Sequence, residues 1–311
     1  MEVDIFNVSL LPPAHIFNDF ENFSAFPLHD WVIQNSYISP LIAVTAYVVL
    51  VFVILPKLRV PAWDPVLKHL FAGWNLLLSV FSAIGVYYCL PFLMDLISRK
   101  GLRYLVCSDT MMLGKPTDDA VACYGPIGYM MSLFMLSKFP ELLDTIFLVI
   151  MGKPVIFLHW YHHITVLLYS WFSYRNATPT AYFFGTMNYT VHAVMYFYFF
   201  ASTYTRKLSF MRKPITLLQL TQMFFGVSAT VIAYIYTADG LGCSKSYADG
   251  TFFLFCSMLY GSYFVLFAKL FVDNYLRKPK SKKAPLVAKR DEPKPSKRAS
   301  TPKKSKGKRV D

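Results

Sequence analysis

Charged side chains are scarce in this sequence of 311 residues. Asp, Glu, Lys and Arg together make up 16% of the chain, whereas hydrophobic residues make up 55% and aromatic residues 17%. An average soluble domain contains about 25% charged residues. The composition therefore argues against an ordinary soluble protein and predicts a chain that is buried in lipid.

Positive charge is missing from residues 1–36, which contain five acidic side chains and no Lys or Arg. A cleavable signal peptide needs a basic start followed by a continuous apolar core, so we expect none here. An acidic leader before the first apolar stretch favours the non-cytosolic side of a membrane. We therefore predict a lumenal segment over residues 1–36.

The opposite end of the chain carries most of the net charge. Residues 276–311 hold 15 of the 31 basic residues and three of the 18 acidic ones, so they supply +12 of the net charge of +13. This segment has too few large apolar side chains to offset the entropy cost of ordering. We predict a disordered, basic, cytosolic tail. Because the rest of the chain is nearly neutral, the charge does not predict a nucleic-acid partner.

Seven apolar stretches approach the roughly 20 residues that a spanning helix requires. Short connectors with Pro, Gly or charge separate them, and there is no internal repeat. The expected fold class is all-α: a polytopic membrane protein with a seven-helix domain over residues 37–275. Alternate connectors collect Lys and Arg, which places them and the C-terminus in the cytosol and the N-terminus in the lumen. The predicted spans are residues 38–55, 67–90, 125–151, 155–174, 181–202, 215–236 and 252–272.

Cysteine is also rare, with five residues and no metal-ligand spacing. Cys123 and Cys243 fall in predicted lumenal positions, where an oxidising compartment permits a disulfide. We treat a Cys123–Cys243 bridge as a hypothesis. Two unpaired thiols are the alternative.

Ionisable residues inside the bilayer are costly, so they mark candidate sites. The third predicted span contains Lys138, Glu141 and Asp144, followed by Thr145, on one helical face. We expect these side chains to point inward together. A buried ion pair that only stabilises packing is the alternative interpretation.

The next three predicted spans carry further polar residues at helical spacing. A single intramembrane histidine is usually a hydrogen-bonded core residue, but three on one helix face favour a functional site. The amides of the sixth span can bind a substrate or link helices. The candidates are His159, His162 and His163 in the fourth span, Asn188, His192 and Tyr196 in the fifth, and Gln219 and Gln222 in the sixth.

These segments together resemble the eukaryotic very-long-chain fatty acid elongase family, the membrane 3-ketoacyl-CoA synthases. Their order and spacing match the family pattern over residues 40–275, which makes the resemblance specific. The blocks read Lys138-Phe-Pro-Glu141-Leu-Leu-Asp144-Thr145, His159-Trp-Tyr-His162-His163, Asn188-Tyr-Thr-Val-His192-Ala-Val-Met195-Tyr196 and Thr216-Leu-Leu-Gln219-Leu-Thr-Gln222.

The resemblance implies an enzyme of the endoplasmic reticulum membrane whose last six spans enclose a tunnel for an acyl chain. It implies condensation of acyl-CoA with malonyl-CoA, with His162 as the expected nucleophile. His159, His163, His192 and Asn188 are expected to orient the nucleophile or to stabilise the oxyanion. Lys138, Glu141 and Asp144 are expected either to position the histidines or to contact the malonyl carboxylate.

No cofactor or metal is expected for this reaction. Besides acyl-CoA, malonyl-CoA and membrane lipid, the expected partners are the ketoreductase, dehydratase and enoyl reductase of the elongation cycle, and no nucleic acid. The sequence leaves the existence of a homo-oligomer open.

Two other classes of protein share features with this sequence. A membrane di-iron desaturase or hydroxylase also contains His-x-x-His-His. The iron site of such an enzyme is built from about eight histidines, and only four cluster in this sequence. A seven-helix receptor or transporter would fit the predicted topology and would use the polar cluster for a ligand or for protons.

Overall fold

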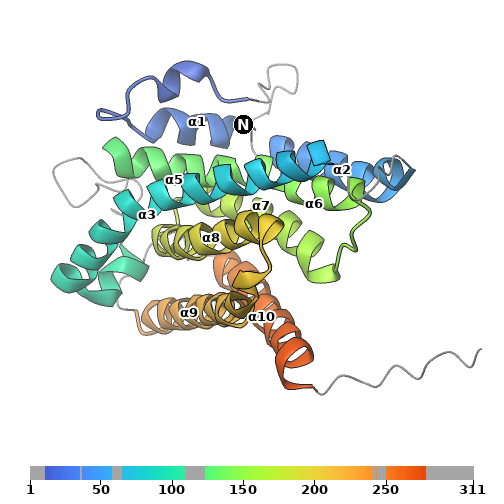
Figure 1. The fold of residues 1–311 in the computed structure, drawn as a ribbon. Helices are drawn as coiled ribbons and strands as arrows, with labels where there is room; N and C mark the ends of the chain where they lie inside the picture. The colour runs from blue at the N-terminus through green and yellow to red at the C-terminus, as the bar shows by residue number, and fades with distance from the viewer. Residues whose placement is uncertain are drawn as a thin grey trace, which may run out of the picture. The chain divides into compact units, whose positions relative to one another are not determined.

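The computed structural model of the chain describes residues 11–35, 37–57, 65–108, 123–240, 243 and 250–277 (Figure 1). These residues form helices and no β-strand, apart from an isolated antiparallel bridge between Ser24 and Tyr124. The predicted all-α fold is therefore confirmed for this part of the chain. The predicted basic tail lies outside the described residues, except for its first two positions.

The helices follow one another with short connections. The α-helices are α1 (Phe26–Asn35), α2 (Ile38–Val49), α3 (Pro65–Cys107), α5 (Gly125–Ser137), α6 (Leu143–Ile150), α7 (Phe157–Arg175), α8 (Thr180–Tyr204), α9 (Arg212–Ala238) and α10 (Thr251–Phe271). Short 3₁₀ or π segments adjoin them, namely η2 (Ala14–Phe17), η3 (Leu50–Ile54), η4 (Leu55–Lys57), η6 (Pro140–Leu142), η7 (Lys207–Met211) and η9 (Val272–Leu276).

Four helical segments of the described chain are long and apolar enough to cross a membrane. They are Ile38–Lys57, Pro65–Cys107, Lys207–Ala238 and Thr251–Leu276, and they coincide with four of the seven predicted spans. The chain is therefore a multi-pass membrane protein. The other predicted spans are helical, but the count of seven stays a prediction.

The predicted third span is divided rather than continuous. Pro140 has no N–H to donate to a carbonyl one turn earlier, and the backbone tightens around it into 3₁₀ geometry. The N–H of Phe139 donates to the Leu136 carbonyl at 3.1 Å, and the N–H of Leu142 donates to the Phe139 carbonyl at 3.2 Å. The result is two helices, α5 and α6, of 13 and 8 residues. Neither is long enough to span alone.

The helices with the most polar residues are also deeply packed. In α7, Leu167 and Trp171 are completely buried, while α3 packs along α8 and α10 packs along α9 (Figure 1). Large apolar side chains cover the outward faces of α3, α9 and α10 instead. Examples are Leu77, Val80, Phe224, Val231, Leu254 and Val265, each exposed by about half or more. These outward faces suit contact with lipid.

One helix, α1, was not predicted from the sequence. It lies within the segment expected to be a lumenal leader, and it packs against the end of α7. The rings of Trp31 and Trp171 meet edge to face with centroids 5.5 Å apart. The His29 Nε2 atom lies 3.0 Å from the Arg175 carbonyl oxygen. This part of residues 1–36 therefore belongs to the folded core.

Candidate active site

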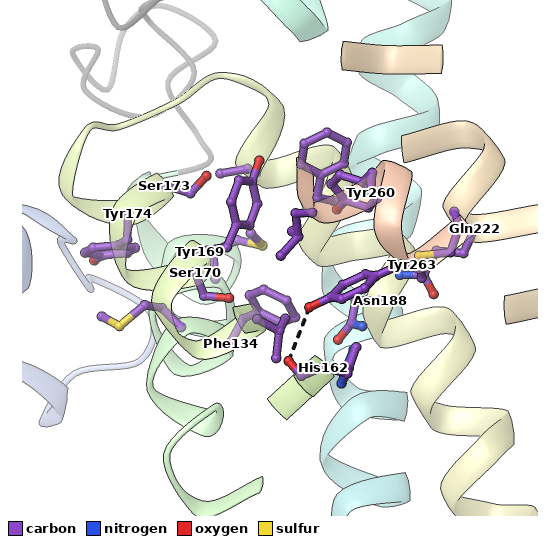
Figure 2. Close-up of a pocket in the computed structure, with 17 residues that line it drawn as sticks. Phe134, His162, Tyr169, Ser170, Ser173, Tyr174, Asn188, Gln222, Tyr260 and Tyr263 are labelled. Carbon is purple, nitrogen blue, oxygen red and sulfur yellow. Dashed lines mark hydrogen bonds between the residues drawn. The ribbon is translucent and has the colours of Figure 1, made fainter. Parts of the chain in front are cut away.

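An elongated cavity runs along one face of α7. The α7 residues that line it share one helix face, and the last follows the first by twelve positions, which corresponds to about 18 Å of helix. The opposite walls come from α5, α8, α9 and α10. Figure 2 shows the lining side chains pointing toward this space. Those from α7 are His162, Val166, Tyr169, Ser170, Ser173 and Tyr174.

The cavity is apolar and aromatic over most of its wall, with a few polar groups at the His162 end. His162 lines it together with Asn188 from α8 and Gln222 from α9. The His162 ring lies against Tyr263, with centroids 5.1 Å apart, and the Tyr263 hydroxyl donates to the His162 carbonyl at 3.2 Å (Figure 2). Three predicted site residues therefore line the same apolar space.

Asn188 connects this end of the cavity to a buried ion pair. The Lys138 ammonium contacts Glu141 Oε1 at 2.7 Å and donates to Asn188 Oδ1 at 3.2 Å. The hydroxyl of Ser137 also donates to Glu141 Oε1, at 2.8 Å. The predicted alternative of a buried Lys138–Glu141 pair is thus present, and it holds a residue that lines the cavity.

The same network orients His192, one turn along α8. The Nδ2 atom of Asn188 lies 3.1 Å from His192 Nε2. Because the amide oxygen accepts from Lys138 and the amide nitrogen can only donate, His192 Nε2 is the acceptor in this contact and the ring proton belongs on Nδ1. His192 is 7% exposed and does not line the cavity. Its contact to the cavity is made through Asn188.

Asp144 is held apart from Lys138 by a second set of partners. Trp74 Nε1 donates to its Oδ1 at 2.6 Å, and the Tyr196 hydroxyl donates to its Oδ2 at 2.7 Å. His163 Nε2 is 3.8 Å from Oδ2, which is too long for a hydrogen bond. Asp144 therefore joins α6 to α3 and α8, and His163 lies beside it.

The three histidines of α7 face two directions. The rings of His159 and His163 are 4.6 Å apart, whereas His162 turns toward α10. Within the described part of the chain, the buried atoms His159 Nε2 and His163 Nδ1 have no hydrogen-bond partner. Positions 162 and 163 differ by about 100° around the helix. His162 therefore lines the cavity, and its ring also meets that of His163 edge to face at 5.5 Å, while His163 lies beside Asp144.

Two further predicted residues link helices. Thr145 Oγ1 accepts a hydrogen bond from the Tyr47 hydroxyl at 2.7 Å, which connects α6 to α2. Gln219 Nε2 lies 3.1 Å from Met195 Sδ, which connects α9 to α8. Of the two glutamines, only Gln222 lines the cavity.

The predicted Cys123–Cys243 disulfide is wrong, because Cys243 is bonded to Cys107. Cys107 ends α3 and belongs to the core cluster of α9 and α10, where Cys243 also packs. Cys123 belongs to a different cluster with Phe23 and Ala25, and its carbonyl accepts from the Ala25 N–H at 2.9 Å. The sequence named Cys243 as one partner of a possible disulfide, but it did not identify Cys107 as the other.

Sequence reasoning missed the contacts of Trp74, Tyr47 and Tyr263. Each is an aromatic residue with a polar atom in an apolar helix, and such atoms find a partner when they are buried. That rule could have marked them as contacts, although it could not have identified their partners. Among the described residues, no group of three or more His, Cys, Asp or Glu side chains has metal-binding geometry.

The helices and the cavity define a multi-pass membrane protein with an elongated apolar space that has a histidine at one end. Residues 32–283 match the GNS1/SUR4 family (ELO), and the chain belongs to this family. It is 34% identical over 266 residues to "Fatty acid elongase 3" of Trypanosoma cruzi, which covers 80% of this chain and 87% of the relative.

Other relatives carry similar names. "Very long chain fatty acid elongase 4" of Trypanosoma cruzi is 40% identical over 237 residues, with 75% of this chain and 78% of the relative covered. "Very long chain fatty acid elongase 6" of Drosophila melanogaster is 41% identical over 206 residues, with 65% and 61% covered. The family expected from the four sequence blocks is therefore confirmed.

Proposed function

We propose that this protein is a fatty acid elongase that condenses an acyl-CoA with malonyl-CoA to give a 3-ketoacyl-CoA two carbons longer. The observation that carries the proposal is the elongated apolar cavity with His162 and Asn188 at one end. An acyl chain would fill the apolar length and bring its thioester to the polar end. The names of the relatives support the same activity.

The first step proposed is attack of a His162 ring nitrogen on the thioester carbonyl. The carbon–sulfur bond breaks, CoA leaves as its thiol with the imidazole proton, and an acyl-histidine forms. Asn188 has a second amide hydrogen that is not directed at His192, and it can donate to the oxyanion of the tetrahedral intermediate. A donor in this role contributes about 3 kcal/mol in other enzymes.

The second step uses malonyl-CoA. Its carboxylate leaves as carbon dioxide, and the electron pair of the broken bond remains on the α-carbon. This carbon attacks the acyl group, the bond to His162 breaks, and the imidazole takes up a proton. The proposed reaction consumes one proton overall and requires no cofactor, metal or reductant. A separate reductase would act on the 3-keto product.

The remaining polar residues are proposed as positioning groups. Lys138 and Glu141 hold the Asn188 oxygen, so that its nitrogen faces the cavity and His192. Asp144, His159 and His163 lie outside the cavity lining, and Asp144 holds α6 to α3 and α8 through Trp74 and Tyr196. The other parts of the proposal are seven spans, a tunnel enclosed by the last six, a lumenal N-terminus, a cytosolic C-terminus and location in the endoplasmic reticulum.

Membranes that contain the protein, incubated with a panel of acyl-CoAs and labelled malonyl-CoA, test the activity. His162→Ala should lower the formation of labelled product by at least about 100-fold. The control is His15→Ala, because His15 is exposed in η2, far along the chain from the cavity. Normal product formation by His162→Ala would refute its role, and no product from the wild type would refute the proposed function.

A second measurement separates chemistry from binding. Labelled acyl-CoA without malonyl-CoA should leave one acyl group on the wild-type protein and release one CoA. His162→Ala should retain no label, whereas His159→Ala should still be labelled because His159 does not line the cavity. Labelling of the His162 variant would assign the nucleophile to another residue.

A further inference from the structure

Three aromatic rings contact one another in the cavity wall. Tyr169, Phe184 and Tyr260 come from α7, α8 and α10, and all three line the cavity. Their ring centroids are 4.6 Å apart for Phe184 and Tyr260, 6.1 Å for Tyr169 and Tyr260, and 6.3 Å for Tyr169 and Phe184. We call these three residues the aromatic triad. A chain that extends from His162 along α7 comes alongside these rings.

Gly226 lies directly behind one ring of the aromatic triad. A Cβ atom added to Gly226 of α9 would overlap Cδ1 and Cε1 of Tyr260 and would lie 2.9 Å from its Cγ. These atoms belong to the body of a rigid ring, so a small rotation of a flexible chain end cannot relieve the overlap. The position of the Tyr260 ring therefore depends on the absence of a side chain at residue 226.

Tyr260 lines the cavity, so empty volume adjoins its side chain there. Tyr260 is 6% exposed and is packed between Gly226 and the Phe184 ring. Protein interiors are packed as densely as organic crystals, so a ring moves into empty volume in preference to packed atoms. A methyl group at residue 226 would therefore push the Tyr260 ring into the cavity.

The distance from His162 to the aromatic triad can be expressed as a number of carbon–carbon bonds of an acyl chain. Tyr169 follows His162 by seven positions of α7, which places it about 10 Å along the helix axis. An extended chain of tetrahedral bonds advances about 1.2 Å per bond, by analogy with the extended peptide backbone. The triad therefore meets an acyl chain about eight or nine bonds from a carbonyl carbon held at His162.

We propose that Gly226 determines which acyl chains this protein accepts, because it gives the Tyr260 ring room outside the path of chains longer than about nine carbons. The inference rests on the proposed elongase function. Gly226 has no side chain and does not line the cavity, but it would control how an acyl chain passes the aromatic triad.

The test compares Gly226→Ala with the wild type on acyl-CoAs of increasing length, with labelled malonyl-CoA. For each acyl-CoA, the rate of the variant is divided by that of the wild type. For acyl-CoAs long enough to pass the triad, this ratio should be at least about tenfold lower than for the shortest acyl-CoA accepted. The reason is that small changes in an apolar pocket alter selectivity by about 10- to 200-fold. An equal ratio at every length would overturn the proposal.

Two glycines provide matched controls. A Cβ at Gly85 would lie 2.6 Å from the Tyr189 ring, which is the same kind of overlap, but Tyr189 does not line the cavity. Gly261 adjoins Tyr260 on α10 and has nothing within 4 Å of an added Cβ. Gly85→Ala should lower stability and Gly261→Ala should not, and both should leave the length profile unchanged. A shift by either control as large as that of Gly226→Ala would overturn the proposal.

Removal of the displaced ring should reverse the effect. The double variant Gly226→Ala/Tyr260→Leu should regain the long substrates, because leucine is smaller than the ring. If Gly226→Ala does not fold, Tyr260→Leu and Tyr260→Trp test the triad directly, with longer or bulkier chains favoured by the first and disfavoured by the second. An unchanged profile in both variants would overturn the proposal. Failure of the wild type to elongate any acyl-CoA would refute the proposed function instead.

Discussion

Two groups of helices in this protein differ in composition and in burial. Segments Ile38–Lys57, Pro65–Cys107, Lys207–Ala238 and Thr251–Leu276 are apolar enough to cross a membrane, and they expose large apolar side chains. Helices α5 to α8 contain the Lys138–Glu141 pair, Asp144, the α7 histidines, Asn188 and His192, most of which are buried. The group with the most polar residues is therefore the one best shielded from lipid.

The difference shows how a membrane protein can contain charges at all. A polar group buried without a partner costs several kcal/mol, and a charge costs more. The charged side chains of the second group have partners inside the protein, since Lys138 contacts Glu141 and Asn188, and Asp144 accepts from Trp74 and Tyr196. Hydropathy therefore identifies the four apolar segments as candidate spans, but it gives a weaker signal for helices α5 to α8, which carry most of the candidate site.

The largest expected effect comes from removal of one member of the inner ion pair. Lys138→Met should cost about 3–5 kcal/mol of stability, because it leaves the Glu141 carboxylate buried without its cation. It also removes the hydrogen bond to Asn188 Oδ1. Thermal unfolding in detergent, with activity measured alongside, checks this prediction.

The double variant Lys138→Met/Glu141→Gln separates the two causes. Without the carboxylate no charge remains unpaired at this position, so at least half of the lost stability should return. Activity should stay low, because the donor to Asn188 is still missing. If the single Lys138→Met variant were as stable as the wild type, the buried charges of α5 to α8 would not depend on their partners, which would contradict the explanation given above.

The sequence predicted the contacts that lie within one or two helical turns. Lys138 and Glu141 are three residues apart and form an ion pair, and Asn188 and His192 are four apart and touch. Helical geometry determines such neighbours without knowledge of the fold. It also separates His162 from His163 by about 100°, which could have predicted that these two rings face different spaces.

Contacts between distant segments could not be predicted in the same way. Trp74 reaches Asp144 across 70 positions, Tyr47 reaches Thr145 across 98, and Cys107 bonds to Cys243 across 136. Contacts between residues so far apart in the sequence depend on which helices pack together. The family resemblance supplied the position of the site, but only the packed helices define the cavity wall and the partners of Asp144.

Two leucine variants compare the two groups of helices directly, and the loss of stability expected from them is of intermediate size. Leu167 of α7 is completely buried against Tyr47 and Val51, whereas Leu77 of α3 is 58% exposed on the outward face. Leu167→Ala should cost about 2–5 kcal/mol because it leaves a cavity, and Leu77→Ala should cost less than about 0.5 kcal/mol.

The same thermal unfolding measurement compares the two leucine variants. Because both substitutions remove the same atoms, any difference reflects the surroundings and not the chemistry of the side chain. Equal losses would mean that α3 packs against another protein surface at Leu77 and does not face lipid there.

The smallest expected effect concerns α1, the helix outside both groups. Burial lowers the pKa of His29 below its ordinary value of 6.5, although its contact with the Arg175 carbonyl opposes this shift. A lowered pKa in the folded state means that the unfolded chain binds the proton more readily. The stabilising contribution of neutral His29 should thus be complete above pH 6.5 and should be lost as the pH falls toward the folded-state pKa.

His29→Gln keeps a donor that can reach the Arg175 carbonyl and removes the titration. Between about pH 7.5 and about pH 5.5, the unfolding temperature of the wild type should therefore fall about 1–2 °C further than that of His29→Gln. His15→Gln, at an exposed position of η2, is measured alongside as a control for the substitution itself. Parallel curves for the wild type and His29→Gln would mean that α1 docks on α7 through its tryptophan and apolar contacts alone.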